Sequence, residues 1–178
     1  MQTLLLLLGL VFMLSTATAT DFNKTLEAKS LLAVDCWKYE TTSSYCTWFG
    51  ITCNEEGSVV QIDAHSCLLK WLDFSLLPNL RSLLLDDCGF GGVIPEQIGL
   101  LSNLTHLSLG RNYLYGKLPV SFTNLTQLEY LDLSYNSITG ILPSQSLKNL
   151  VHLDLSGNHF DGPIPHLSVP WPISPFSI

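Results

Sequence analysis

A repeated segment restricts the fold of this chain more than any other feature of its sequence. Three stretches align without gaps, begin at Leu80, Leu104 and Leu128, and are spaced 24 residues apart. A fourth begins at Leu150, two residues early, because the stretch after Pro143 is shorter. They share the pattern L-x-x-L-x-L-x-x-[NC]-x-x-x-G-x-[IL]-P. A repeat of this length predicts a solenoid, in which similar coils stack and each coil contacts only its neighbours.

The leucines of the repeat occur in pairs that are two residues apart. In a β-strand this spacing turns both side chains to the same side, where they can pack against the adjacent coils. The residues between them face the opposite way, so the strands together predict a parallel sheet with one open face. The pairs are Leu83/Leu85, Leu107/Leu109, Leu131/Leu133 and Leu153/Leu155.

The polar and turn positions of the repeat also have physical reasons. An asparagine follows the strand, where a buried amide can pair with backbone groups of its own and of adjacent coils. A glycine then permits a tight bend, and a proline restricts the following backbone to extended geometry. These positions are Asn112, Asn136 and Asn158, then Gly116, Gly140 and Gly162, then Pro119, Pro143 and Pro165.

The N-terminal residues have the composition of a secretory signal peptide. An apolar run from Leu4 to Leu14 is too short to cross a bilayer, and Ala17-Thr18-Ala19 offers a cleavage site. We therefore predict a signal peptide over residues 1–19 and a secreted chain, the alternative being an N-terminal anchor that stays attached. The net charge of −7, with eight Lys and Arg, argues against binding to nucleic acid. No later run is long enough for a membrane span.

The repeat resembles the plant-specific leucine-rich repeat. The segment "LEAKSLLAVDCWKYETTSSYCTWFGITCNEEGSVVQID" is similar to the N-terminal cap of plant receptor-like proteins and receptor-like serine/threonine kinases. Its matching residues are Glu27 to Leu32, Trp37 and Cys46 to Cys53, and the "LLAVDCWKY" stretch is particularly similar to kinases of the male-discoverer-interacting type. The resemblance implies an α/β leucine-rich-repeat solenoid, a short right-handed arc with a concave parallel sheet and a disulfide-closed helical cap.

The resemblance also divides the chain. We expect the cap over residues 21–58, repeats over 59–165 with one degenerate and four good copies, and a Pro-rich tail over 166–178. Cys46 and Cys53 are predicted to form a disulfide that closes a loop around Trp48 and places the indole over the first coil. By the chain-entropy estimate this loop closure contributes about 2.5 kcal/mol.

Three further cysteines leave alternatives open. Cys67 and Cys88 fall at the asparagine position of their coils, where they are either buried thiols or a disulfide between neighbouring coils. Near Cys36 the family that this segment resembles usually has an aromatic or aliphatic residue, so Cys36 is either a free thiol or bonded to another chain.

The outward strand positions predict a ligand-binding face on the concave sheet. Tyr130 is the strongest candidate, because an amphipathic aromatic side chain supplies contact area at a small entropy cost. Sequons in an exported chain predict N-glycosylation on the sides of the arc. The ligand-facing candidates are His106, Ser108, Tyr130, Asp132, His152 and Asp154, and the glycosylation sites are Asn23, Asn103 and Asn124.

The sequence carries no catalytic motif. Ser, His and Asp share the concave face, but no nucleophile elbow, kinase signature or C-x-x-C metal spacing accompanies them. We expect neither enzyme activity nor a metal or cofactor. The resemblance instead implies the extracellular recognition module of a plasma-membrane receptor, truncated before its kinase, which binds a peptide or protein ligand or a co-receptor. The alternative is a complete small secreted adaptor or inhibitor.

Overall fold

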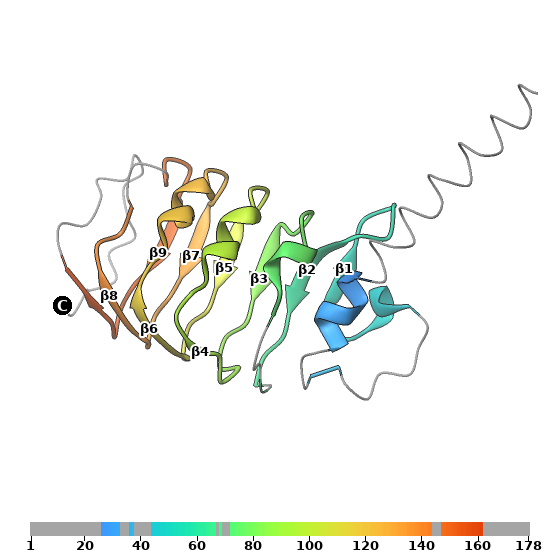
Figure 1. Ribbon diagram of the computed structural model, residues 1–178, viewed down its shortest axis with the longest axis horizontal. Helices are drawn as coiled ribbons and strands as arrows, with labels where there is room; N and C mark the ends of the chain where they lie inside the picture. The colour runs from blue at the N-terminus through green and yellow to red at the C-terminus, as the bar shows by residue number, and fades with distance from the viewer. Residues whose placement is uncertain are drawn as a thin grey trace, which may run out of the picture.

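The computed structural model of the chain describes residues 26–32, 36–37, 44–66, 68, 72–143 and 147–161. In Figure 1 the successive coils lie side by side along the long axis of the molecule, with the capping segment at one end. The predicted signal peptide, Asn23 and the Pro-rich tail lie outside these residues. No helix in the described part of the chain is both long and apolar enough to span a bilayer.

One strand from each coil joins the sheet that the leucine spacing predicts. The strands run in the order β1-β2-β3-β5-β7-β9, and all neighbours are parallel except β1 and β2. Equivalent leucines of successive coils face each other in register, as Leu107 does with Leu83 and Leu131. The strands are β1 (Ile51–Cys53), β2 (Val59–Asp63), β3 (Ser82–Leu84), β5 (His106–Ser108), β7 (Tyr130–Asp132) and β9 (His152–Asp154).

A second parallel sheet, which the sequence analysis did not predict, runs along another side of the coils in the order β10-β8-β6-β4. Gly116 and Gly140, expected to form bends, lie inside its strands with φ of 79° and 83°. A side chain at Gly116 would also place its Cβ 3.0 Å from Val93 Cγ1, so glycine suits both its backbone angle and its neighbour. The strands are β4 (Gly91–Gly92), β6 (Tyr113–Lys117), β8 (Ser137–Gly140) and β10 (His159–Phe160).

Short 3-10 helices follow the prolines of the repeat. Pro95 and Pro119 are the residues before η3 (Glu96–Leu100) and η4 (Val120–Asn124), and both have extended backbone angles. A third helix, η2 (Phe74–Leu76), precedes them in the first full coil, and the three stack in a column. In the coils of β3 and β5 the order is therefore a strand of the first sheet, a strand of the second sheet and a 3-10 helix.

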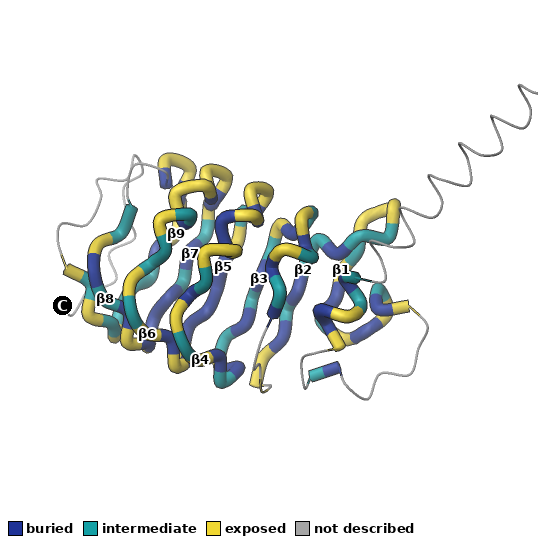
Figure 2. The backbone as a smooth tube through the Cα atoms, in the orientation of Figure 1, coloured by how far each residue is buried: buried dark blue, intermediate teal, exposed yellow. Residues whose placement is uncertain are grey.

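The core lies between these layers and is built from the repeated leucines. The paired leucines of the three coils from Leu83 to Leu133 are 0% exposed, and Leu153 in the last described coil is 2% exposed. Figure 2 shows the buried residues as a band that continues from coil to coil. Leu155, in the coil with no described neighbour beyond it, is only partly buried. Burial of each coil therefore depends on the coil next to it.

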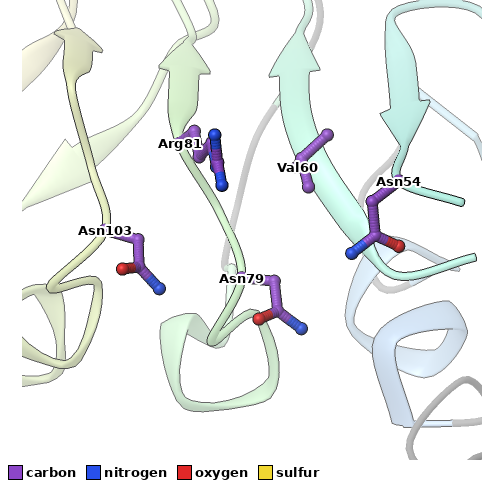
Figure 3. Close-up of a pocket in the computed structure, with 5 residues that line it drawn as sticks. All are labelled: Asn54, Val60, Asn79, Arg81 and Asn103. Atoms are coloured by element: carbon purple, nitrogen blue, oxygen red, sulfur yellow. The ribbon is translucent and has the colours of Figure 1, made fainter. Parts of the chain in front are cut away.

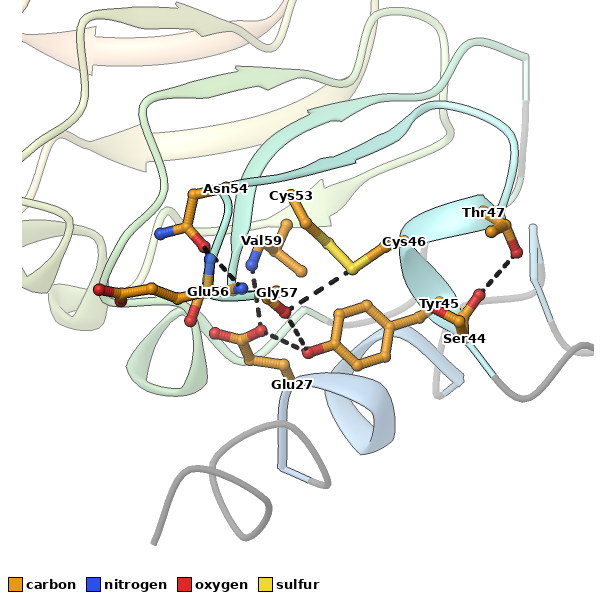
Figure 4. Close-up of a disulfide and its surroundings, with 11 residues drawn as sticks. Glu27, Ser44, Tyr45, Cys46, Thr47, Cys53, Asn54, Glu56, Gly57 and Val59 are labelled. Carbon is orange, nitrogen blue, oxygen red and sulfur yellow. Dashed lines mark hydrogen bonds between the residues drawn. A yellow bond between two sulfur atoms is a disulfide. The ribbon is translucent and has the colours of Figure 1, made fainter. Parts of the chain in front are cut away.

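The cap covers the first coil and is closed by a disulfide. Cys46 and Cys53 are bonded, with their Cα atoms 5.5 Å apart, and join η1 (Tyr45–Thr47) to β1 (Figure 4). The enclosed Trp48 is 5% exposed and packs in the same core as the leucines of the repeats. Its ring meets Tyr45 edge to face, with 6.4 Å between the ring centroids. The indole thus shields the end of the leucine core.

A buried carboxylate joins the cap helix to the first repeat. Glu27, in the helical segment 26–32, is 3% exposed. Its Oε2 accepts hydrogen bonds from the Tyr45 hydroxyl at 3.0 Å and from the Val59 amide at 3.1 Å (Figure 4). Burial first, and then the hydrogen bond and charge of Glu27, raise the pKa of Tyr45. These contacts attach the helix to both η1 and β2.

The structure gives the bonding state of two of the three remaining cysteines. Cys36 is disulfide-bonded in this single chain, so neither a free thiol nor a bond to another chain was the right expectation. Cysteines distant in sequence meet only through the fold, and spacing alone could not show this. Cys88 keeps a buried thiol, which is the first of the two interpretations for that position. Cys67 lies outside the described residues.

Candidate functional site

The first column of the open face forms a continuous aromatic stack. β5, β7 and β9 hold His106, Tyr130 and His152 directly opposite one another. The ring centroids of Tyr130 and His152 are 4.3 Å apart with planes 6° apart, and those of His106 and Tyr130 are 5.9 Å apart at 14°. Because the Tyr130 ring lies between the two imidazoles, its hydroxyl edge is the part that a partner can reach. The two imidazoles are exposed and the phenol is half-buried.

Aspartates flank the stack in the next columns. Asp132 and Asp154 are opposite each other on β7 and β9, and each accepts through Oδ1 from the amide two residues on, at 2.8 and 2.9 Å. Asp86 follows β3, and its Oδ1 accepts from the Ser108 hydroxyl at 2.6 Å and from the Gly110 amide at 2.9 Å. These bonds fix one oxygen of each carboxylate and leave the other available.

Ser108 does not act as the sequence analysis expected. It lies on the predicted face, but it is 4% exposed and its hydroxyl donates to Asp86. A residue so covered offers a ligand little contact, and its role is to orient the carboxylate. The sequence pattern did not reveal this hydrogen bond to Asp86, which follows the neighbouring strand β3.

The open face is negatively charged. At residues 61–65, 82–86, 106–110, 130–134 and 152–156 there are four aspartates and no Lys or Arg. The only ion pair among the described residues joins His65 to Asp63, with Nε2 and Oδ1 2.7 Å apart. Burial first, and then the charges of Asp132, Asp86 and Asp154, raise the pKa of Tyr130. The phenol therefore lies in the field of these carboxylates.

An asparagine ladder holds the chain where each strand ends. Asn112 Oδ1 accepts from the amides of Cys88 and Phe90, at 3.1 and 2.9 Å. Its Nδ2 donates to the carbonyls of Leu85, Leu109 and Gly110 at 2.8 to 3.0 Å. Asn136 and Asn158 bond in the same way, each to its own coil and to the previous one. The predicted pairing with adjacent coils is confirmed.

Cys88 takes the place of an asparagine in this ladder. Its thiol donates to the Ala64 carbonyl at 3.0 Å, the position that corresponds to Leu85 for Asn112. A thiol can donate one bond but has no amide oxygen to accept from backbone amides of the previous coil, as Asn112 Oδ1 does from Cys88 and Phe90. The substitution keeps the bond donated to the previous coil and gives up the bonds that an amide oxygen would accept there.

The two described sequons lie near the edges of the coils. Asn103 is exposed and donates to the Pro78 carbonyl at 3.3 Å. It lines a hollow of about 300 Å³ with Asn79, Arg81, Val60 and Asn54, at the edge where the sheet strands begin (Figure 3). Asn124 ends η4, is exposed, and donates to the Gly99 carbonyl at 3.5 Å. Their glycosylation stays a prediction.

A further group of exposed aromatic residues was missed by sequence reasoning. Tyr113 and Tyr115 on β6 and Tyr135 on the adjoining turn are 76%, 58% and 55% exposed. The Arg111 guanidinium carbon lies 4.6 Å from the centroid of the Tyr135 ring. The alternation of Tyr113, Leu114 and Tyr115 is typical of a half-buried strand and could have indicated β6.

The described residues contain no cluster of three or more His, Cys, Asp or Glu side chains that could hold a metal ion. What the site offers is a surface of ring edges, hydroxyls and carboxylates on a rigid sheet. Such groups make hydrogen bonds and ionic contacts with a bound partner.

Comparisons with known proteins agree with this architecture. A leucine rich repeat family model matches residues 78–138 and 102–160. Probable LRR receptor-like serine/threonine-protein kinase RPK1 of Arabidopsis thaliana is 32% identical over 181 residues, covering 89% of this chain and 29% of that protein. The chain thus spans less than a third of that relative's length.

Solved structures show the same relationship. The BIR3–SERK2 complex from Arabidopsis thaliana superposes with a TM-score of 0.62 at 31% identity, over 72% of each chain. The plant peptide hormone receptor RGFR1, solved in complex with RGF2, gives a TM-score of 0.59 at 35% identity, over 67% of this chain and 19% of that one. The chain therefore belongs to the leucine-rich-repeat family, and within it to the ectodomains of plant receptor-like proteins and receptor-like kinases.

Proposed function

We propose that this chain is an extracellular recognition module that binds a peptide or protein ligand, or a co-receptor, through its concave face. The observation that carries the proposal is the His106–Tyr130–His152 stack, which presents polar ring edges on a rigid parallel sheet. Asp132 and Asp154 stand beside it with one oxygen each available. Preordered polar and aromatic groups of this kind lower the entropy cost of binding.

Relatives of known structure support this assignment. RGFR1 is a plant peptide hormone receptor solved with RGF2, PEPR1 was solved with AtPEP1, and BIR3 was solved with SERK2. All three structures contain a chain that superposes on the repeats of this one. The alternative of a small secreted adaptor or inhibitor has no support among these relatives. The proposed role is binding, with no chemical step assigned to the described residues.

The proposal places the chain outside the cell. The signal peptide predicted over residues 1–19 would direct export, and the disulfide between Cys46 and Cys53 is stable in oxidising compartments. The relatives are receptor kinases and receptor-like proteins, whose recognition domains face outward. Glycans at Asn103 and Asn124 would then cover the edges of the coils and leave the aromatic stack open.

Site-directed photocrosslinking tests the binding face. Benzoylphenylalanine replaces Tyr130 in one variant, and Val120 or Tyr113 in two control variants. The controls are 81% and 76% exposed, but lie on η4 and on the second sheet. The secreted chains are incubated with extracellular fluid from plant tissue and irradiated. We expect a covalent adduct only at position 130. Adducts at 120 or 113 with none at 130 would refute a concave binding face.

The mass of the secreted chain tests whether it is exported and glycosylated. Intact mass of the chain secreted by plant cells should exceed the peptide mass, and Asn103→Gln and Asn124→Gln should each remove one glycan. Ser102→Ala, next to the first sequon, is the control and should leave the mass of the glycans unchanged. A secreted chain with no glycan would contradict this part of the proposal.

A further inference from the structure

One N-glycosylation sequon opens onto a polar hollow at the edge of the first sheet. The hollow has a volume of about 300 Å³, and its walls are formed by Asn54, Val60, Asn79, Arg81 and Asn103. The side-chain nitrogen of Asn103 points to the side on which Asn79 lies (Figure 3). This nitrogen, Nδ2, donates to the carbonyl of Pro78 in the previous coil at 3.3 Å. A sugar joined to Nδ2 would therefore begin at the wall of the hollow.

The sequon is held in place by the coil before it. The Thr105 hydroxyl donates to the Arg81 carbonyl at 3.0 Å, and the Thr105 amide donates to the same oxygen at 2.8 Å. The amide of Arg81 in turn donates to the Val60 carbonyl at 2.8 Å. The attachment point and the walls of the hollow thus belong to three successive coils that hydrogen bonds join.

The walls of the hollow carry hydrogen-bond donors that are not used within the described chain. No described residue accepts from the Arg81 guanidinium, from the Asn79 side chain or from Nδ2 of Asn54. Oδ1 of Asn54 accepts from two amides of the turn after β1, at 3.1 and 2.9 Å, so this side chain is fixed in its turn. Val60 is half-buried and adds an aliphatic surface. The hollow therefore combines several donors with one apolar contact.

These groups match an N-acetylglucosamine residue. Its hydroxyls and its acetamide carbonyl accept hydrogen bonds, while its methyl group and ring C–H groups suit an aliphatic side chain. The volume of the hollow lies at the lower end of the range for ligand pockets, roughly 300–1,000 Å³, which suits one sugar better than an oligosaccharide. The covalent bond to Asn103 would keep the sugar at a high effective concentration, so weak contacts suffice to hold it.

We infer that the hollow binds the innermost N-acetylglucosamine of a glycan on Asn103, and that this sugar connects the cap turn with the first coils. The inference rests on the extracellular location proposed above and gives the glycan a contact within the fold. Asn124 provides the contrast. It ends η4, donates to the Gly99 carbonyl of η3 and is not one of the residues around the hollow. A sugar on Asn124 would start from the column of 3-10 helices.

Endoglycosidase digestion tests where the sugar lies. The full chain is secreted by plant cells blocked in glycan processing, and the enzyme cuts between the first and second sugars while mass spectrometry of glycopeptides follows each site. Cleavage at Asn103 should be about threefold slower than at Asn124, the factor for a sugar bound about two-thirds of the time. Arg81→Met should bring the two rates together, whereas Arg111→Met, at an arginine outside the hollow, should not. Equal rates in the unaltered chain would overturn the inference.

Thermal unfolding gives a second measurement. Asn103→Gln should lower the melting temperature by about 3 °C, and Asn124→Gln by less than about 1 °C. The chain trimmed to one sugar per site should melt together with the untrimmed chain, because the innermost sugar makes the contact. Arg81→Met should lower the melting temperature of the glycosylated chain and have little effect in the Asn103→Gln background. Equal effects of Arg81→Met in both backgrounds, or a trimmed chain as labile as Asn103→Gln, would contradict the inference.

The outcomes separate this inference from the proposed function. If Asn103 carries a glycan that is cut as fast as the glycan on Asn124, the inference fails and the extracellular location stands. If Asn103 alone lacks a glycan, the inference again fails by itself. If neither site carries a glycan, the inference and the proposed location fail together. Crosslinking at position 130 reports on the concave binding face independently of all three results.

Discussion

The phenol ring of Tyr130 lies parallel to the imidazole of His152, with 4.3 Å between the ring centroids and 6° between the planes. The imidazole of His106 on the other side is farther from the phenol, at 5.9 Å. The two interactions differ in distance and in the angle between the planes, although both pairs are cross-strand neighbours in register. This arrangement orders the ring edges that a partner would meet.

Double-mutant cycles should find a stronger coupling between Tyr130 and His152 than between Tyr130 and His106. The closer pair should couple by about 0.5–1 kcal/mol, because dispersion and ring electrostatics fall steeply with separation. The single and double alanine variants are compared by urea unfolding. Equal couplings in the two cycles would contradict the stack as described.

Asp132→Asn should lower the pKa of Tyr130 and leave it above the ordinary value of 10.0. Burial is the largest cause of the raised pKa and remains, while the charge of Asp132 is removed. The raised pKa favours the neutral phenol in the folded state. The contribution of Tyr130 to the free energy of unfolding is therefore full below pH 10 and is lost as the pH rises through the pKa that Tyr130 has in the folded state. Tyrosinate absorbance is measured against Tyr130→Phe in each background. Glu55→Gln is the control, and an unchanged titration in Asp132→Asn would contradict the field described for this face.

Asn112→Ala should lower the free energy of unfolding by about 3 kcal/mol. The variant leaves two buried amides and three carbonyls without the Asn112 partner. Asn158→Ala, in a coil where the amide is only partly buried and two of its bonds are longer, at 3.3 and 3.5 Å, should cost about 1–2 kcal/mol. Urea unfolding of both variants measures the difference in their free energies of unfolding. Equal losses of stability would show that burial does not strengthen the hydrogen bonds of the asparagine ladder.

Removal of the cap disulfide by Cys46→Ala with Cys53→Ala should cost about 2.5 kcal/mol, the entropy estimate for a short loop. Thermal and urea unfolding measure the loss. A non-reducing peptide map of the unaltered chain should recover Cys46 joined to Cys53. Alkylation of both as thiols would contradict the disulfide. Cys88→Ser, which keeps a donor for the Ala64 carbonyl, serves as the cysteine control and should cost less.

Tyr45→Phe should lower stability by about 1–3 kcal/mol, because buried Glu27 loses one of its donors and keeps the Val59 amide. The raised pKa of Tyr45 keeps the phenol neutral in the folded state. Unaltered chains should therefore lose stability as pH rises above 10.0, where the unfolded phenol ionises first. Tyr45→Phe should lose less over that range, and Tyr113→Phe, at an exposed tyrosine, should behave like the unaltered chain.

Much of the fold was already contained in the sequence. The leucine pairs predicted a parallel sheet, and Leu107 pairs with Leu83 and Leu131 in that sheet. Asn112 and Asn136 bond to adjacent coils as their position after each strand suggested. These inferences succeed because a solenoid repeats the same local contacts, so sequence spacing translates directly into position in space.

Other features depended on the fold as a whole. The second sheet forms because consecutive coils align Tyr115 with Ser137, and a single repeat contains no sign of its neighbour's backbone. The burial of Ser108 and its hydrogen bond to Asp86 of the previous coil also appear only in the folded chain. The disulfide of Cys36 likewise could be recognised only in the folded chain.

The sequence by itself determined the stacking of coils, the buried leucine face and the column that contains His106, Tyr130 and His152. Only the tertiary structure decided that these rings stack closely, that Ser108 is covered, and that Asp86 and Asp132 face each other across Gly110. The reason is physical. Periodicity specifies which side of a strand a residue faces, whereas contacts between side chains depend on distances between coils that no single repeat encodes.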